Sequence, residues 1–302
     1  MTSPPAVAQV PARLGHFVRR MFRPRIYVTY GVLWTVALEG TAENLSGSGA
    51  AWTPSWPTGV RAASVVLALL FARMADEQKD LEYDRRHHPD RPLVTGAITV
   101  AELRGAMVLI TVLLIVLNLL VSAVSVALIL LGLGYTLFLV ALERRFPRVA
   151  GNPLTGLLVS YPVQVLLAVY LYGSLLSAGV IDADRRAVPL LAMFACAFLQ
   201  FEFARKTEWR QDPGARLYSQ VFGPRGSAAI SLALAVGAVA LGLALLGRAG
   251  LLPALALVLP ALGAWRFLLR RRPSGLLLPA MGFVLLFHLL CLSGSTVTAL
   301  GW

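Results

Sequence analysis

The sequence predicts an all-α, polytopic membrane protein with nine transmembrane helices around a central cavity. Of 302 residues, 57% are hydrophobic and 14% are charged, which leaves too little polar surface to cover a soluble globule of this size. Apolar stretches of roughly 17 to 25 residues recur, each long enough to cross about 30 Å of hydrocarbon. They lack the apolar–polar alternation of a membrane barrel, so the spans are helical.

Nine apolar stretches follow one another along the chain. They lie at residues 26–42, 58–75, 104–121, 123–141, 153–173, 187–203, 227–247, 250–268 and 277–298. Glu39 interrupts the first stretch. An ionisable group inside a span is either functional or a sign that the helix boundary lies near the outer surface, and the sequence leaves both open.

The basic residues indicate the orientation. If the N-terminus is cytoplasmic, 23 of the 27 Lys and Arg residues fall in inner segments, which follows the positive-inside rule and predicts an N-in, C-out protein of the cell membrane. The net charge of +12 is then mainly an orientation signal and a contact for lipid headgroups, so nucleic-acid binding is not expected. Residues 1–22 are expected to form a disordered or amphipathic cytoplasmic tail, and residues 23–302 a single transmembrane domain. Cys196 and Cys291 lie in apolar spans and show no disulfide, metal or redox spacing.

Acidic residues gather in one place, which we call the first polar segment (residues 73–96, RMADEQKDLEYDRRHHPDRPLVTG). Six of the fifteen acids of the chain lie within it, although it begins where the second span reaches the cytoplasmic side. Asp76, Asp80 and Asp84 are spaced i, i+4, i+8, so a continuing helix would place three carboxylates on one face. A solvated helix end neutralised by nearby Lys and Arg residues is the alternative.

The chemistry of serial carboxylates favours a metal site. Mg²⁺ is usually held by one or two carboxylates together with waters and phosphate oxygens. Acids flanked by Arg91 therefore suggest a site for a metal-bound diphosphate. Pro89 and Pro92 cannot continue the helix, and Gly96 permits a tight turn before the next helix begins near Thr99.

The run DEQKDLEYDRRHHPDRPLVTG resembles the first aspartate-rich motif of the UbiA superfamily of intramembrane prenyltransferases. In that motif, NDxxDxxxD precedes a Pro-Asp-Arg-Pro turn. Asp80 and Asp84 match the second and third acidic positions, while Asp76 stands where the family usually has Asn. The resemblance extends to the span count and the N-in topology. It implies a Mg²⁺-dependent enzyme that acts on an isoprenyl diphosphate and a lipophilic acceptor.

The family leads us to expect a second acidic motif, in what we call the second polar segment (residues 199–223, LQFEFARKTEWRQDPGARLYSQVFG). The usual DxxxD spacing is missing, because Lys206 stands four residues after Glu202. Glu202 can still offer one carboxylate to the metal. Arg205, Lys206 and Arg210 can bind diphosphate oxygens, or one or more of them can serve only as positive-inside anchors.

Each polar segment follows the second span of a four-span unit, so the two should meet across a cavity that opens to the cytoplasm. Apolar walls among the helices would hold the isoprenoid tail. Asn152 and Tyr161 either bond between helices or line the acceptor pocket.

The predicted mechanism combines these parts. Mg²⁺ held by Asp76, Asp80, Asp84 and Glu202 would bridge diphosphate oxygens, and Arg91, Arg205, Lys206 and Arg210 would neutralise the leaving group. The prenyl group would then pass to an aromatic or other small lipophilic acceptor. Two alternatives stay open: a terpene cyclase that needs no acceptor, which the altered second motif favours, and a cation transporter. Against transport, the acids lie beyond the cytoplasmic end of a span, whereas transporter sites usually lie near the bilayer midplane.

Overall fold

The computed structural model describes residues 9–47, 52–146, 151–210, 216–270 and 275–299, and every regular element in these ranges is a helix. In chain order the elements are α1 (Val10–Phe17), the π-helix η2 (Val18–Phe22), α2 (Pro24–Ser46), α3 (Trp56–Lys79), α4 (Leu81–His87), α5 (Val100–Leu119), α6 (Ala123–Arg145), α8 (Pro153–Ser160), α9 (Pro162–Ser177), α10 (Ala187–Arg205), α11 (Ser219–Leu246), η3 (Gly247–Gly250), α12 (Leu251–Ala254), η4 (Leu255–Leu257), α13 (Val258–Arg270) and α14 (Leu277–Ala299). The all-α class predicted from composition is therefore confirmed.

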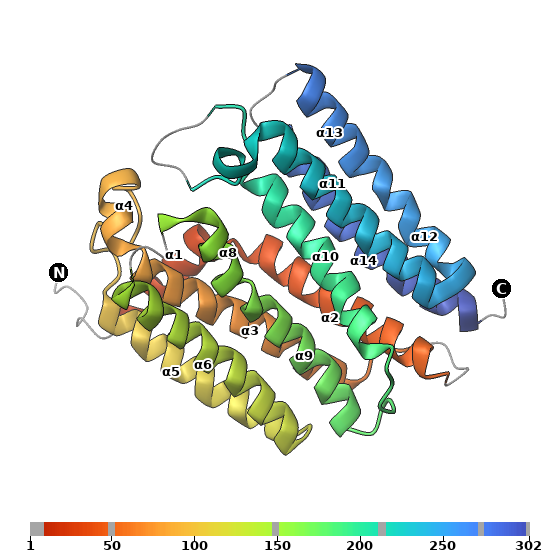
Figure 1. Cartoon of the computed structure of the whole chain (residues 1–302). Helices are drawn as coiled ribbons and strands as arrows, with labels where there is room; N and C mark the ends of the chain where they lie inside the picture. Colours follow the sequence, from red (N-terminus) through yellow and green to blue (C-terminus); the bar gives the residue numbers. More distant parts are fainter. Residues whose placement is uncertain (1–8, 48–51, 147–150, 211–215, 271–274, 300–302) are drawn as a thin grey trace.

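Within the described ranges, six helical stretches are long and apolar enough to cross a membrane: Trp56–Lys79, Val100–Leu119, Ala123–Arg145, Pro153–Ser177, Ala187–Arg205 and Ser219–Leu269. Each of the nine predicted spans falls largely on helix. The last stretch contains two of them, and α11 and α12–α13 lie side by side in opposite directions, joined near Gly247 (Figure 1). The count of nine crossings and the N-in, C-out orientation stay predictions.

Local sequence explains where several helices begin. Ser55 and Thr58 form a reciprocal capping box at the start of α3, and Thr99 and Glu102 form another at the start of α5. Both boxes satisfy backbone N–H groups that would otherwise lack partners at a helix end. The turn before α5 contains Gly96 with φ 75°, the left-handed conformation for which glycine is favoured, so the turn predicted there is confirmed.

The helices pack into a bundle whose two polar segments lie at the same end. α2 packs on α3 and α14, α6 on α9, and α10 on α11. Figure 1 shows α4 and the connection from α10 to α11 at one end, which we call the loop end, and the connection from α9 to α10 at the other. The core between them consists mainly of Ala, Leu, Val and Phe side chains.

Most of the predicted N-terminal tail is helical. Residues 1–8 lie outside the described part of the chain, whereas α1 and η2 occupy residues 10–22. Phe17 and Phe22 are buried, and Arg13 forms an ion pair of 2.5 Å with Glu102. These contacts hold the segment against the loop end, where Arg20 also pairs with Asp90 at 2.6 Å. The apolar side of this amphipathic segment therefore packs against the bundle.

Glu39 is buried and paired. Its carboxylate accepts hydrogen bonds from Thr58 (2.5 Å) and from Arg61 on α3 (3.2 Å), and both charged side chains are at most 3% exposed. Arg61 Nε also donates to Ser174 on α9 at 3.0 Å. This cluster, which we call the outer ion pair, joins three helices in the half of the bundle away from the polar segments. α2 continues past Glu39 to Ser46, so no helix end lies at this residue.

Candidate functional site

The three predicted aspartates of the first polar segment lie in different surroundings. α3 ends at Lys79 and α4 begins at Leu81, but the amide N–H groups of Asp80 and Asp84 still bond the carbonyls four residues earlier, both at 2.8 Å. The i, i+4, i+8 spacing is thus retained across the joint. The side chain of Asp76 is 50% exposed and that of Asp80 31%, whereas that of Asp84 is only 2% exposed.

Arg91 holds the buried part of this segment together. Its guanidinium bonds the carboxylates of both Asp84 and Glu77, at 3.3 Å in the case of Glu77. Glu77 is 1% exposed and also pairs with Arg73. The turn predicted from the Pro-Asp-Arg-Pro run therefore folds back so that its arginine reaches the carboxylates.

Sequence reasoning missed Glu77, although a signal was present. Residues seven apart on a helix differ in direction by about 20°, whereas residues eight apart differ by about 80°. Glu77 is therefore closer in direction to Asp84 than Asp76 is, and only Glu77 shares Arg91 with Asp84. Lys79 instead engages Asp76 at 3.2 Å and, on α6, Glu143 at 3.3 Å. Glu143 is a further buried acid that the motif did not indicate.

Two buried carboxylate oxygens remain without hydrogen-bond partners in the described part of the chain. They are Oε2 of Glu77 and Oδ1 of Asp84. Burying a carboxylate oxygen with no partner is costly, so such atoms indicate that the site accommodates a cation or a hydrogen-bond donor. Burial also raises the pKa of Asp80, which lies beyond the end of α3, although the neighbouring Lys79 opposes this. These residues fit a hard divalent cation.

No metal-ligand cluster is preformed. Among the residues that the structure describes, no three Asp, Glu, His or Cys side chains converge closely enough to hold one ion. The side chains predicted as ligands are instead bonded to arginine and lysine. The set Asp76, Asp80, Asp84 and Glu202 therefore stays a prediction as a metal site.

The predicted groups of the second polar segment bind one another. Glu202 accepts from Arg205 at 2.6 Å and from Lys206 at 2.8 Å, both on its own helical turn. The Tyr218 hydroxyl also donates to Glu202 at 3.3 Å, and Lys206 lies 5.1 Å from the centre of the Tyr218 ring. Lys206 at the missing DxxxD position thus neutralises Glu202 directly. Arg210 is exposed.

Arg216 connects the two polar segments. Its guanidinium lies 4.0 Å from the Asp80 carboxylate and 5.0 Å from the centre of the Tyr83 ring. The second segment therefore approaches the first through a residue that sequence reasoning had not singled out, whereas the central cavity between the two segments stays a prediction. Arg216 lies outside any helix, so no periodic pattern could have placed it.

The two residues predicted to line an acceptor pocket lie apart. Asn152 is exposed, and its side chain caps α8 by accepting from the amide of Leu154 at 2.9 Å. The Tyr161 hydroxyl donates to the carbonyl of Ala195. Its ring centre lies 6.3 Å from that of Phe198, which lies 5.8 Å from Tyr30, and Phe194 lies 6.4 Å from Phe287. The ring of His288 joins the two groups, and we call these five residues the aromatic cluster: Tyr30, Tyr161, Phe194, Phe198 and Phe287.

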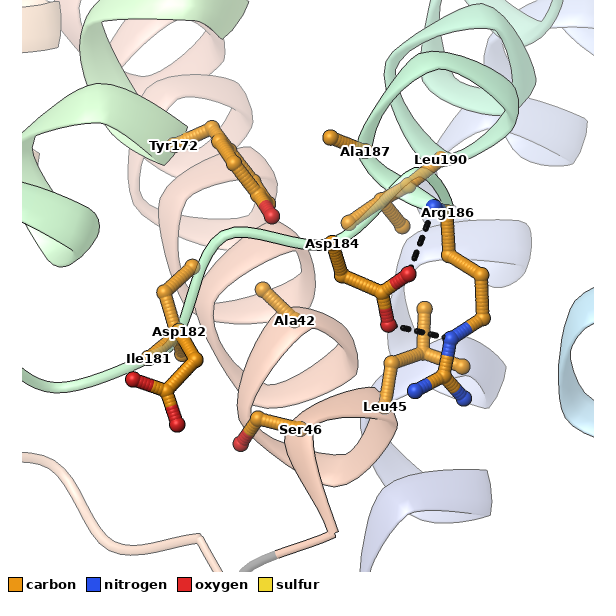
Figure 2. Close-up of a pocket in the computed structure, with 10 residues that line it drawn as sticks. All are labelled: Ala42, Leu45, Ser46, Tyr172, Ile181, Asp182, Asp184, Arg186, Ala187 and Leu190. Atoms are coloured by element: carbon orange, nitrogen blue, oxygen red, sulfur yellow. Dashed lines mark hydrogen bonds and ion pairs between the residues drawn. The ribbon is translucent and has the colours of Figure 1, made fainter.

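A small surface pocket lies at the opposite end of the bundle from the polar segments. Figure 2 shows it between the end of α2, Tyr172 of α9 and the connection into α10. Asp184 in this pocket accepts from the amide of Arg186 at 2.9 Å and from its guanidinium. Both of its carboxylate oxygens are thus engaged, and the pocket is not part of the candidate site.

Comparison with known proteins supports one family. The sequence profile described as the UbiA prenyltransferase family matches residues 27–293. A solved structure titled as the apo form of a UbiA homolog from Aeropyrum pernix K1 superposes with a TM-score of 0.62 at 18% identity, covering 88% of this chain and 97% of that one.

A second structure, from work on the biosynthesis of digeranylgeranylglyceryl phosphate synthase in membranes, has a TM-score of 0.55 at 16% identity. It covers 93% of this chain and 100% of that one. No curated protein matches the sequence significantly. Because the structural likenesses are distant, they support the fold alone, whereas the profile spans most of the sequence: the chain belongs to the UbiA prenyltransferase family.

Proposed function

We propose that this protein is a Mg²⁺-dependent intramembrane prenyltransferase, which ionises an isoprenyl diphosphate and transfers the prenyl group to an aromatic or other small lipophilic acceptor. One observation carries the proposal: buried carboxylate oxygens without partners in the first polar segment lie at the same end as the basic groups of the second. That juxtaposition suits a ligand that brings both a divalent cation and an anionic diphosphate.

Asp76, Asp80 and Asp84, together with Glu202, would hold Mg²⁺, and Glu77 is a further buried acid of the first segment beside Asp84. Bound Mg²⁺ would supply charge stabilisation for the departing diphosphate. Arg216 touches Asp80 only loosely, at 4.0 Å, so its guanidinium is available to diphosphate oxygens in a bidentate fork. Further cations bond directly to the proposed metal-binding acids and would add to the diphosphate site together with Arg210: Arg91, Arg205 and Lys206.

Residues on the membrane side of the site suit the second half of the reaction, in which the acceptor attacks the carbocation. Phe198 lies four residues before Glu202 on α10, about 40° around the helix from it, so the aromatic cluster begins one turn from Glu202. Rings attract cations through their electron-rich faces. A carbocation formed below the polar segments would therefore meet apolar and aromatic walls, which exclude water until the acceptor attacks.

The same aromatic cluster favours a second candidate, a terpene cyclase. In that case the double bonds of the substrate would be the nucleophiles, and no acceptor would be needed. The two functions share the diphosphate site and differ only in what lies against the cation.

One experiment separates them. The purified protein in detergent with Mg²⁺ is given prenyl diphosphates of several lengths, first without an acceptor and then with phenolic or quinone-type compounds, and organic extracts are examined by mass spectrometry. We expect little more than slow hydrolysis without an acceptor and prenylated product with one. Efficient conversion to a cyclic hydrocarbon or alcohol without an acceptor would establish the cyclase instead. Failure to consume any prenyl diphosphate would refute both.

A further inference from the structure

A histidine on α14 has an unused hydrogen-bonding atom deep in the bundle. His288 is 2% exposed, and among the described residues its Nε2 has no hydrogen-bond partner. Buried polar atoms in proteins are nearly always satisfied, by protein, by water or by a ligand. An unsatisfied nitrogen atom this far from bulk water calls for an explanation.

The other ring nitrogen fixes what Nε2 offers. His288 Nδ1 lies 2.6 Å from the carbonyl oxygen of Val284. Because a carbonyl oxygen can only accept, Nδ1 carries a hydrogen and donates it. Nε2 of the neutral ring is therefore an acceptor with a free lone pair, and it requires a partner that donates an O–H or N–H group.

Aromatic rings surround His288. Its ring centre lies 5.3 Å from that of Phe194, 6.1 Å from Tyr30 and 6.1 Å from Phe287, all members of the aromatic cluster. Tyr30 in turn stacks on Trp34 at 5.7 Å, and the buried indole Nε1 of Trp34 likewise has no hydrogen-bond partner within the described ranges. Aromatic walls with one free acceptor and one free donor match a planar ligand that carries a hydroxyl group.

The position along α10 connects this place with the diphosphate site. At 1.5 Å and 100° per residue, Phe198 and Phe194 lie about 6 and 12 Å along α10 from Glu202 and about 40° and 80° around the helix from it. The ring of His288 lies against Phe194, the farther of the two. His288 is therefore about two helical turns along α10 from Glu202, a depth that suits an aromatic acceptor placed beside the reacting carbon.

We propose that His288 is a specificity-determining residue, whose Nε2 accepts a hydrogen bond from a hydroxyl group on an aromatic acceptor held against the aromatic cluster. The inference rests on the proposed prenyltransferase function. It concerns recognition only, so the release of diphosphate does not depend on it. Replacing the imidazole should change which acceptor is used and should leave the release of diphosphate unchanged.

The test compares a phenolic acceptor with its methyl ether, in the wild type and in two variants. His288→Leu removes the acceptor atom, and His288→Gln keeps an amide oxygen in its place. Cys291→Ala, another buried position on α14, is the matched control. We expect the wild type to prefer the phenol in kcat/KM by about 10- to 100-fold, because the ether leaves Nε2 unsatisfied. In His288→Leu this preference should fall to within about threefold, mainly through a higher KM for the phenol, whereas His288→Gln and Cys291→Ala should retain most of it.

Diphosphate release from the prenyl substrate alone is measured for every variant. Equal release together with a lost preference supports the inference, since a purely structural role for His288 would not affect the choice between phenol and ether. An unchanged preference in His288→Leu overturns it while leaving the proposed function intact. If His288→Leu does not fold, His288→Gln and the wild type are compared instead. In that case, the absence of any preference for the phenol overturns the inference. A wild type that consumes no prenyl diphosphate overturns both claims.

Discussion

At the scale of single residues, the first polar segment separates acids that are held by arginine from acids that remain accessible. Asp84 and Glu77 share Arg91, whereas the side chain of Asp80 is 31% exposed and has Arg216 at 4.0 Å. Asp76, at 50% exposed, and Asp80 are therefore the acids of the predicted metal set in this segment that an incoming cation can reach, and Asp80 has the looser ion pair of the two. Glu82, two residues further on, is 80% exposed and pairs only with a neighbouring arginine, Arg85, in the described part of the chain.

These two acids provide a matched pair of substitutions. Asp80→Asn should reduce Mg²⁺-dependent diphosphate release by at least about 100-fold, because it removes charge from the ion that stabilises the leaving group. Glu82→Gln should change it less than about threefold, since an exposed ion pair contributes little. Release is measured with a coupled phosphate assay across a Mg²⁺ titration. An essential Glu82 together with a dispensable Asp80 would show that the first segment does not act through this face.

Arg216 supports a separate prediction about substrate binding. If its guanidinium engages diphosphate oxygens, Arg216→Ala should raise the KM for the prenyl diphosphate about 10-fold or more, and Arg216→Lys should restore only part of the loss because lysine lacks the bidentate fork. Arg225→Ala, at an exposed position of α11 outside the second polar segment, is the control. The KM is obtained from initial rates at varied prenyl diphosphate concentrations. Equal effects of Arg225→Ala and Arg216→Ala would indicate a general loss of positive charge, with no specific contact by Arg216.

At the scale of the helices, the outer ion pair is the contact that fixes α2, α3 and α9 against one another. Glu39 and Arg61 are at most 3% exposed, and Ser174 completes the arrangement from α9. Breaking a buried pair leaves an uncompensated charge, whereas replacing both partners removes the desolvation penalty together with the attraction. Stability should therefore depend on the pair in a strongly non-additive way.

A double-mutant cycle tests this. Glu39→Met and Arg61→Met alone should each destabilise the protein by about 3–5 kcal/mol, while the double variant should lie within about 1–2 kcal/mol of the wild type. Arg248→Met, at an exposed arginine, should change stability by less than about 0.5 kcal/mol. Unfolding is followed by circular dichroism in detergent. Additive losses in the double variant would mean that the two side chains act independently.

The sequence predicted the elements better than it predicted the contacts within the site. Apolar length located the helices because the bilayer thickness sets how long they must be, and the capping pair Thr99 and Glu102 marked the start of α5. Motif spacing located the two polar segments. Lys206 stands four residues after Glu202, so helical spacing alone indicates that the two can pair. The contact of Arg216 with Asp80 could not be predicted in this way, because Arg216 lies outside any helix.

At the scale of the whole molecule, both polar segments lie at one end of the bundle, and α14 ends at the other (Figure 1). The excess of Lys and Arg at the loop end predicts that this end faces the cytoplasm. Two exposed positions report on this: Ala183, between α9 and α10, and His88, in the first polar segment.

In a background with Cys196→Ala and Cys291→Ala, Ala183→Cys should react with an impermeant maleimide on intact cells. His88→Cys should react only after the membrane is opened. Labelling of a permeabilised sample shows that both cysteines are accessible in principle. The reverse pattern on intact cells would place the candidate site outside the cytoplasm.

The outer ion pair also has a consequence for how the chain enters the membrane during synthesis. α2 carries Glu39 and is not among the six stretches apolar enough to cross a membrane, whereas α3 is among them despite Arg61. A charged side chain costs about 2.5–3.5 kcal/mol near the centre of an inserting helix and less toward its ends. Because Glu39 forms its ion pair with Arg61 on α3, α2 gains this partner only once α3 has emerged from the ribosome. The two helices are thus expected to leave the translocon together as a hairpin, so a chain truncated before α3 should release α2 from the bilayer.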